Sequence, residues 1–275
     1  MIEQNKNLSE ENEILYGQAF SSYFENNYEL SINICKKIIK FEQFKFSIQD
    51  LLASNYKKQK KYLEALKIYK IQLKQNRTNL TFYNIGCLFL DLGRIKKAHY
   101  YFNKSKEIKA NDYTNLNNLS LCKLKLKDFK NGFLLYENRL KKKVDAVTNK
   151  FTHITSPKSL NEIKDKKILI WDEQGLGDTI QFSRFVIDLL KFTKEITLVV
   201  NSKLSKILSY LNEKIKVCDY NNIEESKFDF QIPLCSLPKF LKLEKVEDIN
   251  FYKLNILFDK TCKINLDPKK YNVGL

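Results

Sequence analysis

The chain has 275 residues, a mass of 32.6 kDa and a net charge of +16 at pH 7. At roughly 100–200 residues per domain, this length predicts two domains. Hydrophobic residues make up 43% and charged residues 29%, which is typical of a globular protein and argues against a mainly disordered chain. No apolar run approaches the ~18 residues of a membrane-spanning helix, and the first residues lack the apolar core of a secretory signal. We therefore expect a cytoplasmic protein without a transmembrane segment.

The positive charge does not by itself predict a nucleic-acid partner. Arginine supplies the planar fork that binds phosphates and base edges, and almost all the basic residues here are lysine. We therefore expect a lysine-rich surface and no nucleic-acid binding. The six cysteines form no C-x-x-C pair and the chain has two histidines, so zinc-type spacing is absent and we expect no metal site.

The first half of the chain repeats at steps of 34, 33 and 34 residues. One set of small residues comprises Ser31, Ala65, Ala98 and Gly132. The set four positions later comprises Cys35, Tyr69, Phe102 and Tyr136. Two further sets keep the same steps, namely Tyr28, Tyr62, Ile95 and Phe129, and the small residues Ala19, Ala53, Gly86 and Ser120.

This period resembles the tetratricopeptide repeat, a pair of antiparallel helices of about 34 residues. Small residues such as Gly86 and Ala98 would lie where two helices cross closely, and Phe89 and Phe102 would fill the space between repeats. We expect the turns within the hairpins at Asn26-Asn27, Gln59-Lys60, Leu92-Gly93 and Lys127-Asp128. The resulting domain organisation is an N-terminal tail at 1–11 and about four repeats at 12–145.

Such a solenoid offers a groove to a protein or peptide partner, or it only packs against the second domain. Asn84, Asn117 and Asn118 fall on the first helices of their hairpins, but they do not complete a carboxylate clamp. Residues 146–164 lose the helical periodicity and contain Ser156-Pro157, which predicts a linker.

The pattern changes after Asp165. Apolar runs predict strands at 168–171, 196–200, 216–218 and 228–233, with helices at 180–190 and 204–211 between the first three. This alternation predicts a parallel sheet in a three-layer α/β arrangement. The loop after the first strand holds Gly175 and Gly177, but Ile180 replaces a third glycine and no Gly-Lys-Ser/Thr follows. Neither a nicotinamide fingerprint nor a P-loop fits, which leaves a turn where a ligand can approach the backbone at a helix N-terminus.

The string Ile170–Phe185 is more specific. It resembles a bacterial family in which tetratricopeptide repeats precede a GT-B glycosyltransferase similar to the lipopolysaccharide heptosyltransferases. Tyr136-Glu137-Asn138-Arg139 resembles the end of that family's last repeat, and Asp229–Pro238 resembles a later segment. The fold class implied is a helical solenoid followed by one Rossmann-like parallel-sheet half-domain at 165–275.

Tyr271–Leu275 resembles the first strand of the second GT-B half. The resemblance therefore implies that residues 165–275 are an incomplete domain and that the donor-binding half lies outside these 275 residues. In a full-length form it implies a nucleotide-sugar donor, no further cofactor, and a protein or glycan acceptor. The 275 residues alone are expected to be inactive. The alternative is a non-catalytic scaffold that binds proteins through its repeats.

By the same resemblance, Asp178 is the candidate base, whereas its position after a glycine turn also suits a helix N-cap. Glu173 is the second candidate, with a solvated loop acid as the alternative. The residues expected to contact the sugar substrate are Gln174, Gly175, Gly177, Thr179 and Gln181, with ordinary surface glutamines as the alternative for Gln174 and Gln181.

Overall fold

The computed structural model describes residues 2–40, 45–141, 151–224 and 227–250, with side chains from residue 11 onward. The chain forms two compact units that divide near residue 142. Tyr271–Leu275, which suggested the start of a second GT-B half, lies outside the described residues. Among the described helices, none is long and apolar enough to cross a membrane.

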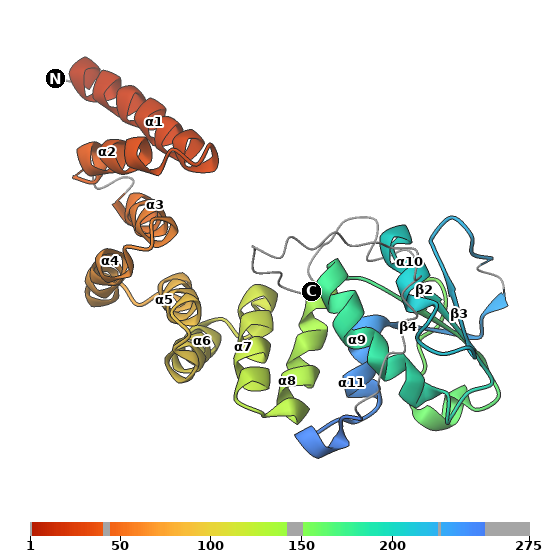
Figure 1. Ribbon diagram of the computed structural model, residues 1–275. Helices are drawn as coiled ribbons and strands as arrows, with labels where there is room; N and C mark the ends of the chain where they lie inside the picture. The colour runs from red at the N-terminus through yellow and green to blue at the C-terminus, as the bar shows by residue number, and fades with distance from the viewer. Residues whose placement is uncertain (1, 41–44, 142–150, 225–226, 251–275) are drawn as a thin grey trace, which may run out of the picture. The chain divides into compact units, whose positions relative to one another are not determined.

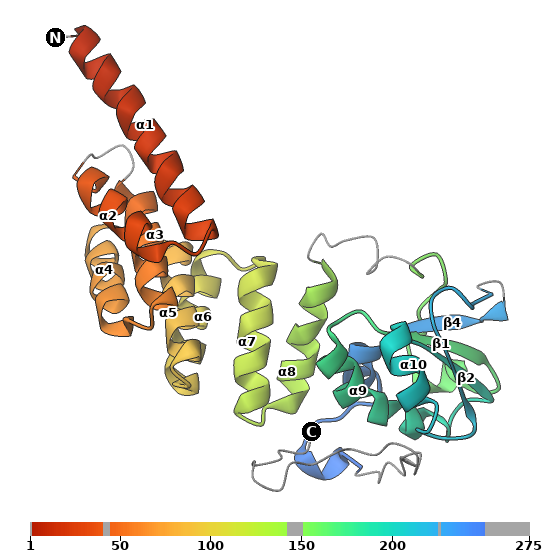
Figure 2. The same cartoon turned by 45° about the horizontal axis from the view of Figure 1, so that its top comes forward.

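The first unit is a row of helical hairpins (Figure 1). Its helices are α1 Ile2–Phe24, α2 Tyr28–Ile38, α3 Lys45–Lys58, α4 Tyr62–Gln75, α5 Asn79–Asp91, α6 Ile95–Ile108, α7 Tyr113–Lys125 and α8 Phe129–Tyr136. Each odd-numbered helix packs against the next even-numbered one, and Figures 1 and 2 both show α7 and α8 side by side. The predicted tetratricopeptide-type architecture is confirmed in this unit.

The predicted register is confirmed at the turns. The second helix of each hairpin begins at Tyr28, Tyr62, Ile95 or Phe129, the members of one repeated set. Two residues before each start, the backbone takes a positive φ, at Asn26 (64°), Lys60 (60°), Gly93 (67°) and Lys127 (65°). A left-handed residue after the last helical turn is the usual way to satisfy the final carbonyls of a helix. The turns of these four hairpins therefore share one left-handed backbone conformation.

The small residues of the repeat lie at helix crossings, as predicted. A Cβ atom added to Gly86 would lie 2.5 Å from Cε1 of Phe102, so a side chain at this crossing of α5 and α6 would require the buried Phe102 ring to shift. Ala98 and Phe102 are fully buried in the same core. Phe89 stacks on Tyr101 with ring centroids 5.4 Å apart. These contacts bury the apolar faces of the α5–α6 hairpin.

Buried polar groups link consecutive hairpins. Asn55 of α3 donates its side-chain amide to Ser31 Oγ of α2 at 2.8 Å, and Ser31 Oγ donates to the carbonyl of Ala19 at 2.7 Å. The predicted closing motif lies just after α8, in the 3₁₀ helix Glu137–Lys141. There the Arg139 guanidinium pairs with Glu137 at 2.8 Å, beside the ring of Tyr136.

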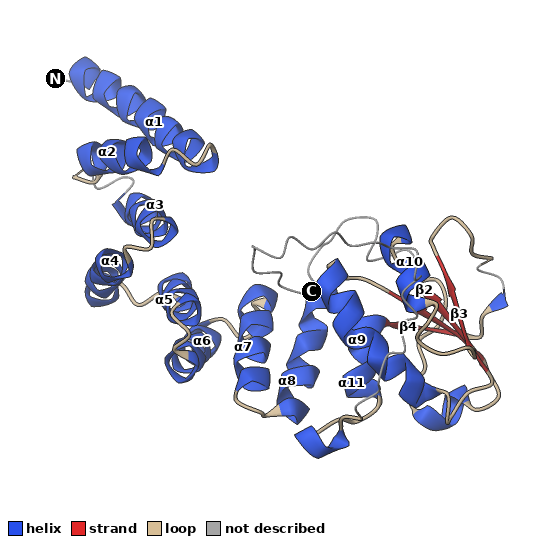
Figure 3. Cartoon of the chain, in the orientation of Figure 1, coloured by secondary structure: helices blue, strands red, loops and turns tan. Residues whose placement is uncertain are grey.

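The second unit contains a four-stranded sheet in the order β3-β2-β1-β4, and every pairing is parallel (Figure 3). Its elements are β1 Lys167–Trp171, α9 Leu176–Leu189, β2 Glu195–Val199, α10 Ser202–Leu208, β3 Ile215–Cys218, β4 Phe230–Pro233 and α11 Leu237–Phe240, with 3₁₀ helices at Leu160–Ile163, Leu234–Ser236 and Val246–Asp248. The predicted parallel sheet is confirmed.

The two faces of this sheet are covered differently. Leu169, Trp171 and Val199 pack against Phe151 and Ile154 on one face, in a cluster to which α9 contributes nothing. Helix α9 contacts α10 and α11, so these helices gather on the other face. The structure differs from the predicted three layers, because in the part of the chain that it describes no α-helix covers the face of Leu169, Trp171 and Val199.

Part of the segment predicted as a linker packs against the sheet of the second unit. Residues 142–150 lie outside the described residues, but the remainder of the predicted linker is built into the second unit. Phe151 is fully buried, and the carbonyl of Thr155 accepts the backbone N–H of Gln231 at 3.1 Å. The Gln231 side chain donates to Ser156 Oγ at 2.7 Å. The loss of helical periodicity correctly predicted irregular chain. It cannot distinguish an exposed linker from irregular chain that is buried in a core.

Candidate functional site

The strand order reverses beside β1. The chain runs outward from β1 to β2 and β3, then returns to form β4 on the opposite side of β1. In open parallel sheets, ligands bind beyond the carboxyl ends of the strands at such a reversal. The last residues of the two strands, Trp171 and Pro233, lie in register. The chain that follows them is therefore the candidate site.

Asp172 holds this edge together. It is 6% exposed, and its Oδ2 accepts the backbone N–H of Asn201 at 2.9 Å and the Thr179 hydroxyl at 3.4 Å. Its Oδ1 accepts the hydroxyl of Tyr220. Burial and this hydrogen bond raise the pKa of Tyr220 above its ordinary value. One carboxylate thus joins chain segments that follow β1, β2 and β3 to the first turn of α9.

Glu173 is buried rather than solvated. It is 7% exposed, and its Oε2 lies 3.5 Å from the backbone nitrogen of Cys235, just beyond β4. The interpretation as a solvated loop acid is therefore wrong. The side chain lies at the strand-order reversal itself, between the ends of β1 and β4.

Asp178 is not the N-cap of α9. Helix α9 begins at Leu176 with Gly175 as the N-cap, so Asp178 is the third helical residue, and no side chain caps this end. The N-cap interpretation is wrong because the helix starts at Leu176, three residues earlier than an N-cap at Asp178 would require. The half-buried Asp178 carboxylate leans toward the loop, since a Cβ on Gly175 would lie 3.7 Å from its Oδ2.

The two glycines have open space around them. A Cβ on Gly177 would meet no atom within 4 Å, and one on Gly175 would meet only the Asp178 carboxylate. Gly175 has a φ of −67°, so ordinary residues could adopt its conformation. Neither internal packing nor backbone strain in the described structure requires glycine here. The absence of side chains leaves the amide groups at the start of α9 accessible from outside.

The other expected substrate contacts divide into two groups. Gln174 and Gln181 are exposed beside the glycines. Thr179 is 1% exposed, and its hydroxyl donates to Asp172 and to the carbonyl of Gly175. The Thr179 side chain therefore faces inward and does not reach a ligand at the surface. Leu176 and Ile180, which are 41% and 51% exposed, add apolar area to the outer side of the first turns.

Two aromatic contacts lie beside the loop. Trp171 is 1% exposed, and its indole N–H donates to Gln231 Oε1 at 2.6 Å. The Arg184 guanidinium of α9 lies 4.9 Å from the ring centroid of Phe185.

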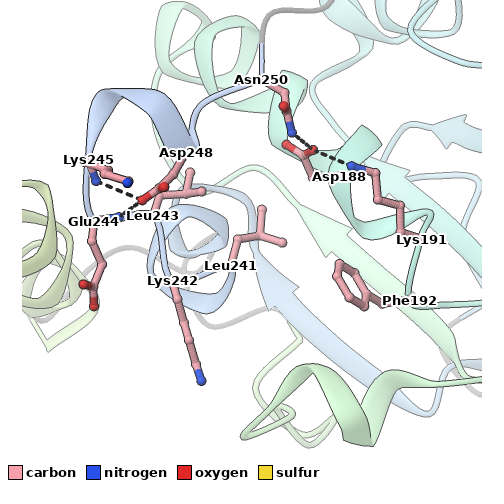
Figure 4. A pocket seen from close by; sticks show the side chains of 10 residues that line it. All are labelled: Asp188, Lys191, Phe192, Leu241, Lys242, Leu243, Glu244, Lys245, Asp248 and Asn250. Atoms are coloured by element: carbon pink, nitrogen blue, oxygen red, sulfur yellow. Dashed lines mark hydrogen bonds and ion pairs between the residues drawn. The ribbon is translucent and has the colours of Figure 1, made fainter.

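A hollow of about 650 Å³ lies at the C-terminal end of α9, away from the glycine loop (Figure 4). In it Asp188 accepts a hydrogen bond from the Asn250 side chain at 2.6 Å and lies 3.8 Å from the Lys191 ammonium. Asp248 accepts two backbone N–H groups, at 2.9 and 3.0 Å. These carboxylates already have partners, and the hollow is remote from the strand ends, so we assign it no ligand.

The first unit presents a second candidate surface. The first helices of successive hairpins contact one another, α1 with α3 and α5 with α7, and we call the surface they form the A-helix face. Two of the three asparagines expected there make internal bonds. Asn84 donates to Asp50 Oδ1 at 3.2 Å and Asn118 donates to the Tyr83 hydroxyl at 3.1 Å. A pocket of about 280 Å³ opens between α1 and α3.

No protein-family model matches the chain, and no curated protein matches its sequence significantly. Among solved structures, a MamA RS-1 double mutant is 14% identical over 47% of this chain and 74% of that chain, with a TM-score of 0.41. The first TPR of Spaghetti (RPAP3), solved with an HSP90 peptide, is 18% identical over 43% and 94%, with a TM-score of 0.39. A Thermobaculum terrenum O-GlcNAc transferase mutant is 12% identical over 74% of this chain and 41% of that chain, with a TM-score of 0.44. These values are too low to carry a functional argument.

Proposed function

We propose that the chain is a repeat scaffold whose second unit is the acceptor-side half of an inverting GT-B glycosyltransferase. The first unit binds a polypeptide on its A-helix face. The second unit binds a sugar acceptor, part of a protein or a glycan, at the loop after β1. The observation that carries the proposal is the open glycine loop at the strand-order reversal, because it combines accessible amides with a carboxylate.

The chemistry assigned to the loop is removal of a proton from an acceptor hydroxyl. As the hydroxyl oxygen attacks the anomeric carbon, its proton passes to the Asp178 carboxylate, and the bond to the donor's nucleotide breaks with its electron pair leaving on the phosphate. The amide groups at the start of α9 hold acceptor oxygens. Asp172 acts as a positioning residue, because its bonds to Asn201 and Thr179 fix the first turn of α9.

The nucleotide-sugar donor is assigned to a second Rossmann-like half. In GT-B enzymes the two halves face each other, and the described residues contain a single sheet. Holding donor and acceptor together can lower a barrier by ~7–11 kcal/mol, so one half cannot supply the rate alone. We therefore expect the 275 residues to bind an acceptor without turning over a nucleotide sugar.

The test is a saccharide titration of the ¹⁵N-labelled chain followed by NMR. We expect a bound acceptor to shift the backbone amides of Leu176, Gly177 and Asp178. Gly177→Ala should weaken binding without harming the fold, because its new methyl group meets no protein atom. The matched control is Gly17→Ala, which makes the same change in α1 where the space is equally open.

Two results would overturn the acceptor site. In the first, saccharides shift only amides far from the loop. In the second, Gly177→Ala and Gly17→Ala bind saccharides equally well. If peptides bind the A-helix face while no saccharide shifts any amide, the chain is a protein-binding scaffold without an acceptor site.

A further inference from the structure

We propose that the pocket between α1 and α3 binds the ammonium or guanidinium group of a lysine or arginine in the polypeptide partner. The inference rests on the proposed polypeptide binding and adds the chemistry of the partner. Three independent features of the first unit carry it: an aromatic wall, a carboxylate without a cation, and a local excess of acidic residues.

The wall of the pocket is aromatic on the α1 side. Tyr16, Phe20, Tyr23 and Phe24 line it. The Tyr16 and Phe20 rings meet edge to face with centroids 4.9 Å apart, and the Tyr23 and Phe24 rings do so at 5.6 Å. Aromatic faces attract ammonium and guanidinium groups through the negative potential of the ring. Phe24 is 74% exposed, which leaves that side of the pocket open to a partner.

The α3 side supplies Asp50. Its Oδ1 accepts from the Gln72 amide at 3.1 Å and from the Asn84 amide at 3.2 Å. Both donors are neutral, and within the described residues no cation pairs with Asp50. Burial raises the pKa of this carboxyl above its ordinary value, as expected for a carboxylate that lacks a compensating charge. The two amides hold the carboxylate in place, and an incoming cation would supply the missing charge.

The α1 side of the pocket belongs to an acidic segment of a basic protein. Residues 11–35 contain Glu11, Glu13, Glu25 and Glu29 and no lysine or arginine, although the whole chain carries +16. These glutamates are exposed but lie outside the pocket lining, as do the three lysines of α3. The lining itself holds one acidic side chain, Asp50, and no basic one, so it complements a cationic side chain and disfavours an acidic one.

The size of the pocket agrees with a single side chain. Its volume of about 280 Å³ is below the ~300–1,000 Å³ that is common for small-molecule sites. A partner would place one cationic residue between the rings and Asp50, with its backbone along the A-helix face. An extended polypeptide supplies that geometry, whereas a bulky cofactor does not fit.

The experiment measures binding of fluorescent decapeptides to the full chain by anisotropy. The peptides share one neutral sequence and differ at a single central residue, which is lysine, arginine, norleucine or glutamate. We expect the lysine and arginine peptides to bind at least tenfold more tightly than the norleucine peptide. The glutamate peptide should bind most weakly.

The variant is Asp50→Asn, which keeps the acceptor oxygen for Gln72 and Asn84 but removes the charge. It should reduce the preference for lysine over norleucine to less than twofold. The matched control is Asp91→Asn on α5, where the carboxylate is already paired with Lys57 at 3.2 Å, and this variant should keep the preference. Circular dichroism melting of both variants shows whether the fold is retained.

The outcomes separate the two proposals. If no peptide binds, polypeptide binding by the first unit fails and the inference fails with it. If peptides bind but glutamate is accepted as well as lysine, or Asp50→Asn keeps the preference, the inference is overturned and polypeptide binding stands. If spermidine competes as strongly as the lysine peptide, the pocket is a site for free amines. The proposal that the bound cation belongs to a polypeptide is then wrong.

Discussion

Gly86 lies where a side chain has no room, since its added Cβ would meet the Phe102 ring at 2.5 Å. Gly86→Leu should therefore lower the free energy of unfolding of the first unit by ~1–3 kcal/mol, the usual cost of overpacking a core. Urea unfolding followed by circular dichroism measures this. Gly17→Ala is the control, because its Cβ meets no atom and alanine should stabilise α1 by about 0.5–1 kcal/mol. A Gly86→Leu protein as stable as the parent would contradict the assigned helix crossing.

Asp178 lies in the first turn of α9 without capping it, and this gives a specific mutational pattern. A carboxylate there interacts favourably with the helix dipole, typically by ~0.3–1 kcal/mol. Asp178→Asn should therefore destabilise the second unit slightly, because it removes the charge. Asp178→Ala removes the same charge but gains helix propensity, so it should be at least as stable as the asparagine variant. Thermal melts at low and high salt measure the effect, which salt should weaken. Asparagine restoring full stability while alanine costs ~0.5–2 kcal/mol would show an N-cap instead.

The sequence predicted the position of the loop after β1 but not the hydrogen bonds of Asp172 that hold it. Gly175 and Gly177 were visible as a turn, whereas the roles of Asp172 and Tyr220 depend on a contact across 48 residues. One feature of the sequence did point to Asp172. An acidic residue directly after a buried strand lies at the edge of the sheet, where a buried carboxylate needs hydrogen-bond donors. The burial of Glu173 was not visible in the sequence for the same reason, since it depends on the return of β4 beside β1.

At the scale of helices and turns, four hairpins share a left-handed residue two positions before their second helix. This residue is glycine in only one of them, at Gly93. A non-glycine residue in the left-handed region costs roughly 1–2 kcal/mol, while glycine costs about 0.5–1 kcal/mol in chain entropy. Lys60→Gly and Lys127→Gly should therefore stabilise the first unit by about 0.5–1 kcal/mol each, and Gly93→Lys should destabilise it similarly. Urea midpoints measure these shifts. A loss of stability in Lys127→Gly would contradict the turn assignment.

Helices and strands were predicted well where a period repeated. The starts of α2, α4, α6 and α8 coincide with one repeated set of residues because the same packing problem recurs in each hairpin. The four strands were visible as apolar runs between turn residues. The residues that cover the sheet face of Leu169, Trp171 and Val199 were not predicted. Phe151 and Ile154 lie in irregular chain, and their burial depends on the sheet.

For the molecule as a whole, buried phenols predict a loss of stability in alkaline solution. Burial raises the pKa values of Tyr69 and Tyr83 in the first unit and of Tyr220 in the second. A raised folded pKa means that the unfolded chain releases its proton first. The stabilisation is complete below the ordinary tyrosine pKa of about 10 and is lost as pH rises above it, by up to ~1.4 kcal/mol per pH unit for each group.

Unfolding free energies at pH 8, 9, 10 and 11 measure this loss. Burial also raises the pKa of the Cys35 thiol from 9.0 to about 11, so the decline should begin near pH 9. Tyr69→Phe should reduce the slope, because phenylalanine keeps the packing and does not titrate. Constant stability between pH 9 and pH 11 would contradict the burial of these side chains.

The most direct test of the account is a crystal structure of the chain with a saccharide that shifts the loop amides. We predict an acceptor hydroxyl within about 2.6–3.2 Å of the Asp178 carboxylate, with the amides of Leu176 and Gly177 facing the sugar. A saccharide bound away from the carboxyl ends of β1 and β4 would contradict the account. So would a sugar at the loop that places no hydroxyl within reach of Asp178.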